Sequence, residues 1–352
     1  ESSSQARGAS ESSCQASRAD WRLASARRRS GVPVRALVFH GPGDLRLEDV
    51  PRPEATNEGD VLVQVEVALT DGTDLKAFRR GHPVLLGPPP SPFGHEFCGV
   101  DTATGRRVVA ANSAPCGTCA PCLRDQETLC QNLFPLLNGA YAEFILVPER
   151  IARTNLLPVP PGMPPEVAAM VEPLACCFHG VEKAGVSAGD TVAVIGLGPI
   201  GLMLCACVAD AGGWPVGVGS RPERRALAPL FGAETGTGEG ADIVIEAAGT
   251  AEAWQLALGL VRPGGTVLAF GGLPREARVA VDPFRIHYEE VTLRGAFHHA
   301  PRHVRTALAF LGSGAYPFER LITHQVGLEG VAGLLADPPP DYLKAAVVVS
   351  SG

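Results

Sequence analysis

The sequence predicts an α/β protein with two domains, one rich in short β-strands and one containing a doubly wound parallel sheet. The chain has 352 residues and is 45% hydrophobic, which is enough for two sizeable cores. Residues 34 to about 155 contain short apolar runs broken by Gly and Pro. From about residue 165 to 300, apolar β-branched runs alternate with Ala/Leu-rich segments. Such alternation is typical of parallel strands joined by crossover helices.

The composition excludes several classes of protein. A net charge of −7 and an aromatic content of 6% give neither a basic nor a stacking surface for nucleic acid. The longest apolar run, residues 191–209, has the length of a membrane span, but three glycines and a proline near its middle indicate a strand, a turn and a buried helix. Of the ten cysteines, four lie within residues 116–130 and the others are scattered. We therefore expect no membrane segment, no disulfides and a cytoplasmic location.

The N-terminal 33 residues differ from the rest of the chain. They are rich in Ser, Arg and Ala and show no apolar periodicity, so residues 1–33 are expected to be a disordered extension. Glu1, Glu11 and Asp20 argue against a transit peptide, and the segment lacks the apolar stretch of a secretory signal.

The folded sequence is expected to begin with the hairpin VRALVFHGPGDLRLEDVPRP, which turns at Gly-Pro-Gly. The alternating run VLVQVEVA, residues 61–68, then predicts a half-buried strand. This strand leads into D-G-T-D, residues 71–74, which places two carboxylates and a hydroxyl at one turn. The turn is either an ordinary Asx-type turn, since Asp and Gly favour turns, or a site where Asp71 binds a cation.

Four cysteines follow in one polar segment, CGTCAPCLRDQETLC. Their spacing, C-x2-C-x2-C-x7-C, favours a closed tetrahedral zinc site, which would be structural because it has no open position. An iron–sulfur cluster is the main alternative, although nothing else in the sequence indicates electron transfer. The four residues are Cys116, Cys119, Cys122 and Cys130.

Two further stretches carry unusual polar residues. PFGHEFCG places His95 and Glu96 in a turn, and AAMVEPLACCFHG places Glu172 on an apolar segment that is predicted to be helical. A carboxylate among Ala, Val, Leu and Cys is costly to bury without a partner. Glu172 therefore either lies on a solvent-facing stripe or has a cation as its partner.

A dinucleotide fingerprint follows the apolar strand TVAVI. Gly196, Gly198 and Gly201 have G-x-G-x-x-G spacing, and Pro199 and Ile200 begin the helix that follows. The glycines allow a tight turn and a close approach of the backbone to a pyrophosphate at the helix N-terminus. A glycine-rich turn without a ligand is the alternative, but the strand–turn–helix context favours a dinucleotide site.

The next strand end indicates which dinucleotide is bound. An acidic residue about 20 positions past the fingerprint binds the ribose of NAD, but this chain has Gly219-Ser220-Arg221 at that place. The missing carboxylate and the guanidinium together favour NADP over NAD, unless Arg221 is only a solvated surface charge.

G-H-E, the four-cysteine segment, V-E-P-L-A and G-L-G-P-I-G, in this order, resemble the zinc-dependent medium-chain dehydrogenase/reductases. These are the alcohol and polyol dehydrogenases with a GroES-like catalytic domain. The resemblance covers residues 34–352 and implies a GroES-like catalytic domain at 34–172, with a C-terminal return at 298–352. It implies a Rossmann dinucleotide-binding domain at 173–297 and a homodimer or homotetramer paired near VTLRGAF.

The resemblance also assigns roles to the polar residues. In the family the first metal ligand is normally Cys in a C-G-[ST]-D turn, and Asp71 takes its place here. His95 becomes the second ligand, Glu96 and Glu172 correspond to carboxylates that ligate the metal or hold its water, and Thr73 matches the hydroxyl that passes the substrate proton outward. Carboxylate has the charge of a thiolate, but it is a harder ligand and accepts other divalent ions. The alternative is a decayed site in which Asp71 is only a turn residue.

Residues near the last parallel strand complete the expected site. By similarity Ala296 and Phe297 hold the nicotinamide through backbone contacts. His298 and His299 follow, and because adjacent side chains should point apart we expect at most one of them to face the substrate. Lys76 stands where many members have His, either as part of a proton relay or as a surface residue.

The expected activity is hydride transfer between a secondary alcohol, such as a polyol or sugar, and NADP. Two zinc ions per subunit are expected, one catalytic and one structural. A zinc-free quinone- or enoyl-type reductase of the same fold and a non-catalytic NADP-binding protein are the alternatives. The sequence departs from the usual family pattern on the adenine side of the sheet, where only TGTGEG separates FGAE from ADIVIE. The sheet is therefore expected to lack a helix on one face.

Overall fold

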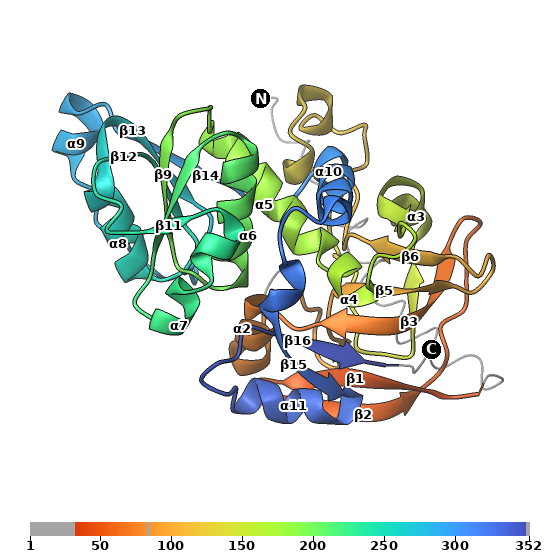
Figure 1. Ribbon diagram of the computed structural model, residues 1–352. Coiled ribbons are helices and arrows are strands. Elements are labelled where there is room, and N and C mark those ends of the chain that lie inside the picture. The colour runs from red at the N-terminus through yellow and green to blue at the C-terminus, as the bar shows by residue number, and fades with distance from the viewer. Residues whose placement is uncertain (1–31, 83–84, 350–352) are drawn as a thin grey trace, which may run out of the picture.

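The computed structural model describes residues 32–82 and 85–349, so the extension expected at residues 1–33 lies outside the described part except for residues 32 and 33. A β-rich half and a parallel-sheet half lie side by side, with a helix, α5, between them (Figure 1). The predicted fold class is confirmed by this architecture.

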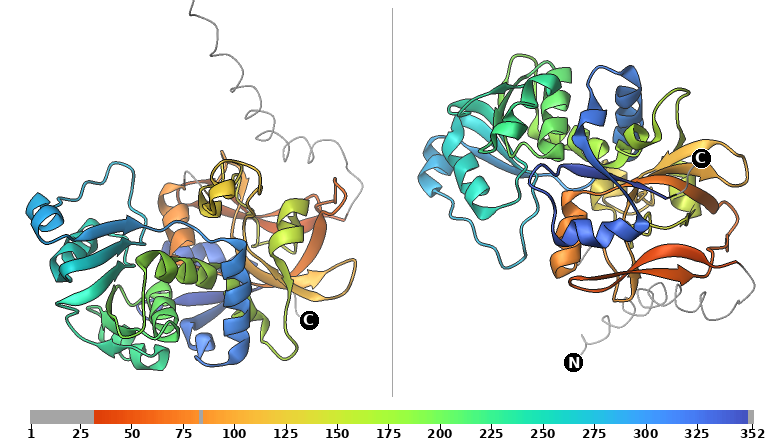
Figure 2. Two further views of the ribbon diagram at one scale, coloured as in Figure 1. Left: turned by 90° about the horizontal axis from the view of Figure 1, so that it is seen from above. Right: turned by 60° about the horizontal axis from the view of Figure 1, so that its bottom comes forward.

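The β-rich half contains two sheets. One has the strand order β2-β1-β4, and the other has the order β15-β16-β3-β5-β6-β8, with β7 also paired to β3. The C-terminal β16 pairs antiparallel with β3, so the end of the chain returns to the first strands (Figure 2). The strands are β1 (Val34–Gly41), β2 (Asp44–Val50), β3 (Val61–Leu69), β4 (Ser91–Pro92), β5 (Glu96–Asp101), β6 (Arg107–Ala110), β7 (Phe144–Val147), β8 (Leu156–Pro158), β15 (Ile322–Gly327) and β16 (Lys344–Val348).

Helices pack against the strands of this half of the molecule. α5 packs against α10 on one side and against the first helix of the parallel-sheet half on the other, so it joins the two halves. None of the helices in residues 32–82 and 85–349 is long and apolar enough to cross a membrane. The nine cysteines of these ranges are free thiols. The helices are α2 (Gly72–Arg80), α3 (Glu149–Asn155), α4 (Pro165–Ala168), α5 (Val171–Ala184), α10 (Pro301–Ser313) and α11 (Leu328–Ala336), with 3-10 turns η2 (Cys122–Arg124), η3 (Glu127–Leu129) and η5 (Phe318–Leu321).

The other half is a six-stranded sheet in the order β11-β10-β9-β12-β13-β14, and all its pairs are parallel. The chain order reverses between β9 and β12, which creates a crevice at their carboxyl ends. The strands are β9 (Thr191–Ile195), β10 (Trp214–Val218), β11 (Glu234–Thr235), β12 (Ala241–Glu246), β13 (Val261–Ala269) and β14 (Thr292–Gly295). The helices are α6 (Pro199–Asp210), α7 (Pro222–Arg225), α8 (Ala251–Leu260) and α9 (Pro283–Tyr288), with the 3-10 turn η4 (Ala228–Phe231).

The connection from β11 to β12 contains no helix, as the short TGTGEG segment predicted. It crosses the sheet face directly. A Cβ placed on Gly238 would lie 2.7 Å from Cβ of Ala193 on β9 and 2.9 Å from Cγ2 of Val218 on β10. The backbone of this segment therefore packs where a helix side chain would otherwise cover the sheet.

Gly238→Ala is expected to destabilise the fold by about 2–5 kcal/mol, because a left-handed alanine costs about 1–2 kcal/mol and overpacking adds about 1–3 kcal/mol. Gly238 has φ +71° and meets the sheet, whereas Gly240 has φ +74° with open space around it. Gly240→Ala is thus a matched control that carries the backbone cost alone. Urea unfolding of both variants tests this, and equal losses would show that the crossover does not press on the sheet.

Candidate active site

Asp71 serves both as a helix cap and as a candidate metal ligand. Its Oδ1 accepts a hydrogen bond from the backbone N–H of Asp74 at 2.7 Å, and Oδ2 of Asp74 accepts from the N–H of Asp71 at 3.1 Å. This capping box begins α2. The other oxygen, Oδ2 of Asp71, lies 3.9 Å from Nε2 of His95. The turn explanation and the ligand explanation are therefore compatible, since each uses a different oxygen.

Burial raises the pKa of Asp71, but the charges of His95 and Lys344 outweigh burial and lower this pKa below its usual value. The hydroxyl of Thr73 donates a hydrogen bond to the carboxylate and adds to this lowering. Lys76, one turn further along α2, extends to the parallel-sheet half. Its Nζ lies 2.9 Å from the position that a Cβ on Gly249 would take. Thr73 therefore lies at the proposed ligand, and Lys76 reaches the crevice between the halves rather than the outer surface.

His95 is oriented by a second carboxylate that sequence reasoning did not single out. Oδ1 of Asp74 lies 3.4 Å from Nδ1 of His95, and the Tyr141 hydroxyl lies 2.5 Å from Oδ2 of Asp74. A carboxylate on one ring nitrogen fixes the imidazole so that the other nitrogen can bind a metal. Burial lowers the pKa of His95, but Asp74 and Asp71 outweigh burial and raise this pKa well above its usual value.

Glu96 has a buried partner, Lys344, that was also missed. Nζ of Lys344 lies 2.9 Å from Oε1 and 2.7 Å from Oε2 of Glu96, and both side chains are essentially inaccessible to solvent. Lys344 begins β16 and Glu96 begins β5, on either side of β3. The signal in the sequence was a single lysine in the otherwise apolar run YLKAAVVV.

Glu172 lies in the first turn of α5 and is 5% exposed, so it does not lie on a solvent-facing stripe. Burial raises the pKa of Glu172, His95 opposes this shift, and Asp71 adds to it. Its Oε1 lies 3.9 Å from Sγ of Cys176 and 3.8 Å from Nε2 of His299.

The charge balance of this site calls for a cation. Four buried carboxyl groups gather here, and among the described residues the only buried ammonium is that of Lys344. Their donor atoms form two overlapping groups that share His95, and within each group all the donor atoms lie within 4.8 Å of one another. Unpaired buried charge is costly, so this set fits a divalent ion held by oxygen and imidazole nitrogen. The groups are Asp71, Asp74 and His95, and His95, Glu96 and Glu172.

Both His298 and His299 lie close to Glu172, although adjacent side chains were expected to point apart. The two rings stack with their centroids 4.0 Å apart. His298 has φ +65°, a left-handed conformation that removes the usual alternation of successive side chains. The Nε2 atom of His298 bonds to the hydroxyl of Ser113, while both ring nitrogens of the buried His299 lack a hydrogen-bond partner among the residues that the structure describes. Burial, followed by repulsion from His95, lowers the pKa of His298 to about 3.

The four predicted cysteines are brought together as expected for a metal site. Their sulfur atoms lie within 4.8 Å of one another, and those of Cys119 and Cys122 are 3.4 Å apart. Backbone N–H groups point at the sulfurs, as from Cys119 to Cys116 at 3.4 Å. Hydrogen bonds, led by that of Asn132, lower the pKa of Cys116 to about 5, which favours the thiolate that a metal requires.

The glycine fingerprint lies at the carboxyl end of β9, as predicted. Gly198 is the N-cap of α6, Pro199 is its first residue, and Ile200 follows in the first turn. A Cβ on Gly201 would lie 1.8 Å from the carbonyl oxygen of Gly196, so only glycine allows the helix to pack this closely on the strand. A glycine loop at a helix N-terminus is an arrangement that can bind a pyrophosphate.

Two arginines follow β10 near this loop. Gly219 packs on Leu197, Ser220 is exposed, and Arg221 is the exposed N-cap residue of α7. Nη1 of Arg224 lies 3.8 Å from the position of a Cβ on Gly198. Burial, followed by the charge of Arg221, lowers the pKa of Arg224. The structure thus brings Arg224 to the glycine loop.

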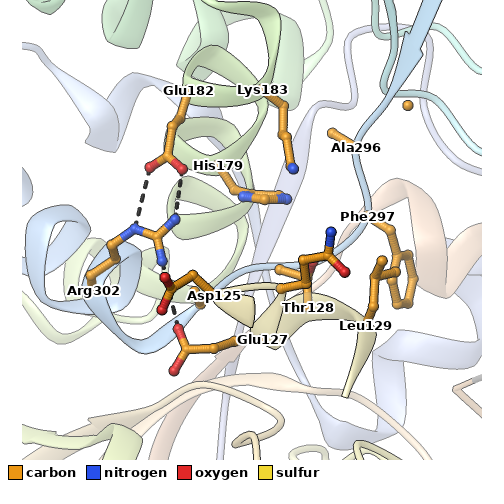
Figure 3. A pocket seen from close by; sticks show the side chains of 13 residues that line it. Asp125, Glu127, Thr128, Leu129, His179, Glu182, Lys183, Ala296, Phe297 and Arg302 are labelled. Carbon is orange, nitrogen blue, oxygen red and sulfur yellow. Dashed lines mark hydrogen bonds and ion pairs between the residues drawn. The ribbon is translucent and has the colours of Figure 1, made fainter. Parts of the chain in front are cut away.

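Ala296 and Phe297 follow β14, where the N–H of Ala296 donates to the carbonyl of Ala269 at 3.3 Å. Both line a hollow of about 320 Å³ between α5, η3 and α10 (Figure 3). His179 and Lys183 of α5 also line it, at helical spacing beyond Glu172, but none of the candidate metal ligands does.

This hollow borders a further group of possible metal ligands, around Glu182 and His303, which does not fit a metal. Nδ1 of His303 accepts the N–H of Ala300 at 3.0 Å, and its Nε2 lies 2.9 Å from Glu182. The neutral ring has one N–H, so Nδ1 is the acceptor and Nε2 must donate to Glu182. No ring lone pair is left for an ion, and Arg302 also pairs with Glu182 at 2.6 Å (Figure 3).

Comparison with known proteins agrees with this geometry. The profile of the alcohol dehydrogenase GroES-like domain matches residues 57–161, and that of the zinc-binding dehydrogenases matches residues 199–313. The erythritol/L-threitol dehydrogenase of Mycolicibacterium smegmatis is 32% identical over 84% of this chain and 91% of its own. The D-altritol 5-dehydrogenase of Agrobacterium fabrum is 31% identical over 88% of this chain and 97% of its own.

A solved structure is similar over nearly the whole fold. It is a protein from Sinorhizobium meliloti 1021, assigned as a zinc-binding dehydrogenase and bound to NADP. It superposes with a TM-score of 0.82 at 30% identity, over 90% of this chain and 100% of that one. The resemblance inferred from the motifs is confirmed: the chain belongs to the zinc-dependent medium-chain dehydrogenase/reductase family.

Proposed function

We propose that the protein is a metal-dependent dehydrogenase that oxidises a secondary hydroxyl group of a polyol, sugar or similar compound with NADP. The observation that carries this proposal is the set of buried carboxylates around His95 beside a dinucleotide fold. The names of two relatives support this substrate class. One is an erythritol/L-threitol dehydrogenase and the other is a D-altritol 5-dehydrogenase.

The catalytic ion would be held by Oδ2 of Asp71, Nε2 of His95 and the carboxylate of Glu172, with Glu96 at its edge. A bound divalent ion supplies Lewis acidity to the substrate hydroxyl, and the nicotinamide supplies the hydride acceptor. Asp74 orients His95, and Thr73 can accept and pass on the hydroxyl proton close to Asp71.

A second zinc ion at the four cysteines would be structural and would give two ions per subunit. Metal content separates this proposal from a zinc-free reductase of the same fold, which would hold one ion or none. Within the described residues β14 is an edge strand of the six-stranded sheet, which supports a homodimer or homotetramer, since an exposed strand edge is a template for pairing with a second copy.

The cofactor preference has its own test, an oxidation screen of polyols, aldoses and secondary alcohols with NADP and NAD in parallel. Arg221→Leu is expected to lower kcat/KM for NADP by about 10- to 100-fold, the value of a charge-assisted bond to a phosphate. The rate with NAD should change less than about three-fold, because NAD lacks the 2′-phosphate.

Arg225→Leu provides the matched control, because Arg225 is an exposed residue of the same short helix. Arg225→Leu should leave the rates with NADP and with NAD near those of the parent enzyme. A parent enzyme that works better with NAD would overturn the NADP assignment, and no turnover with any alcohol or carbonyl would overturn the enzymatic proposal.

A further inference from the structure

One buried side chain joins the two halves of the site. Tyr342 is 8% exposed and lies just before β16. Its carbonyl oxygen accepts a hydrogen bond from Nη2 of Arg224 at 3.2 Å. Its hydroxyl donates to Oγ1 of Thr70 at 2.7 Å. Tyr342 therefore contacts the parallel-sheet half through its backbone and the β-rich half through its side chain.

Thr70 fixes the backbone that carries Asp71. Thr70 is fully buried and directly precedes Asp71 in the chain. Its Oγ1 accepts a second bond from the N–H of Ala345 at 2.8 Å, and its own N–H donates to the carbonyl of Ala345 at 3.0 Å. Loss of the Tyr342 hydroxyl would deprive the Thr70 hydroxyl of one hydrogen-bond donor and loosen the turn at Asp71.

Arg224 can hold Tyr342 and a phosphate at the same time. Nη2 is used by the Tyr342 carbonyl, while Nη1 is directed toward Gly198 of the glycine loop. A guanidinium carries five N–H donors in a rigid plane, so an anion at Nη1 would order the group without competing for Nη2. Phosphate binding at Arg224 therefore strengthens the contact between Arg224 and Tyr342, so the coupling between the two is positive.

We propose that Tyr342 is a positioning residue that couples a cofactor phosphate at Arg224 to the metal ligand Asp71 through Thr70. The inference rests on the proposed function and extends it. Cofactor binding tightens the metal site, and by thermodynamic reciprocity metal binding tightens the cofactor site by the same factor. The physical basis is the shared set of hydrogen bonds rather than proximity of the residues alone.

The test measures metal affinity rather than turnover. Protein that already holds zinc at the four cysteines is titrated with cobalt(II) at the Asp71 site, followed by visible absorbance, without cofactor and with saturating NAD or NADP. NADP should tighten cobalt binding about 5- to 20-fold in the parent, within the usual range of coupling between two sites. The NAD arm separates the pyrophosphate, present in both cofactors, from the 2′-phosphate, present only in NADP.

Tyr342→Phe removes the hydroxyl but keeps the ring and the carbonyl that Arg224 uses. It should reduce the coupling to less than about two-fold while the cofactor affinity of the metal-free protein stays within two-fold of the parent. Thr70→Val should do the same, and Thr70→Ser, which keeps the hydroxyl, should restore the coupling. Tyr316→Phe is the control, since Tyr316 packs in a separate aromatic cluster with Phe231 and Phe318.

The outcomes are distinguishable. Full coupling in Tyr342→Phe, or equal loss in Tyr316→Phe, overturns the role of Tyr342. Absence of coupling in the parent, although it binds both cofactor and metal, overturns it as well. A parent that binds no dinucleotide, or no cobalt at this site, contradicts the proposed function itself.

Discussion

Asp71→Asn is expected to lower kcat/KM for alcohol oxidation by about 10³-fold or more, which corresponds to about 4 kcal/mol of transition-state stabilisation. Asparagine keeps the oxygen that caps α2, and Asn and Asp are equally good N-cap residues. It loses the negative charge that faces Nε2 of His95 at 3.9 Å. Activity and metal content should therefore fall together while the midpoint of thermal unfolding of the metal-free protein stays nearly unchanged.

Asp71→Cys supplies the converse control. The thiolate restores the ligand charge but cannot cap the helix well, so zinc should be retained while stability falls by about 1 kcal/mol. This variant should also shift the metal preference toward zinc, because thiolate is softer than carboxylate. An Asp71→Asn enzyme with unchanged turnover and unchanged metal content would leave residue 71 as a turn residue only.

Local patterns in the sequence were sufficient for the fold class, the glycine loop and the four-cysteine group. Each depends on residues close together in the chain, such as Gly196 and Gly201, whose packing follows from a strand–turn–helix unit. The missing crossover helix was also predictable, since the segment before β12 is too short to contain one.

The groups that orient the proposed ligands could not be predicted in the same way. Lys344 and Glu96 are 248 positions apart in the sequence, and Tyr141 and Asp74 are 67 apart, so only the tertiary fold reveals these pairs. The direction of His298 could not be predicted for a different reason. Its direction depends on a positive φ, which a non-glycine residue adopts only when the surrounding structure imposes it.

Lys344→Met is expected to lower the free energy of unfolding by about 3 kcal/mol, because removing one partner of a buried ion pair leaves the other charge uncompensated. Burial already raises the pKa of Glu96, and the ammonium of Lys344 is the main influence against that shift. The carboxyl group can therefore escape part of the cost by taking up a proton, which keeps the loss at the lower end of the range for buried pairs.

The double variant Lys344→Met/Glu96→Gln separates the two roles open to Glu96. Neutralising both partners should recover most of the lost stability, since a buried pair replaced by uncharged groups of similar size is often close to neutral. If Glu96 only shapes the site, the double variant should still bind cobalt(II) within about five-fold of the parent, whereas Glu172→Gln should weaken binding by at least 10-fold. Equal losses would instead make Glu96 a ligand, which its place within 4.8 Å of donor atoms on His95 and Glu172 allows. A double variant as unstable as Lys344→Met alone would show that the pair is not what stabilises this end of β16.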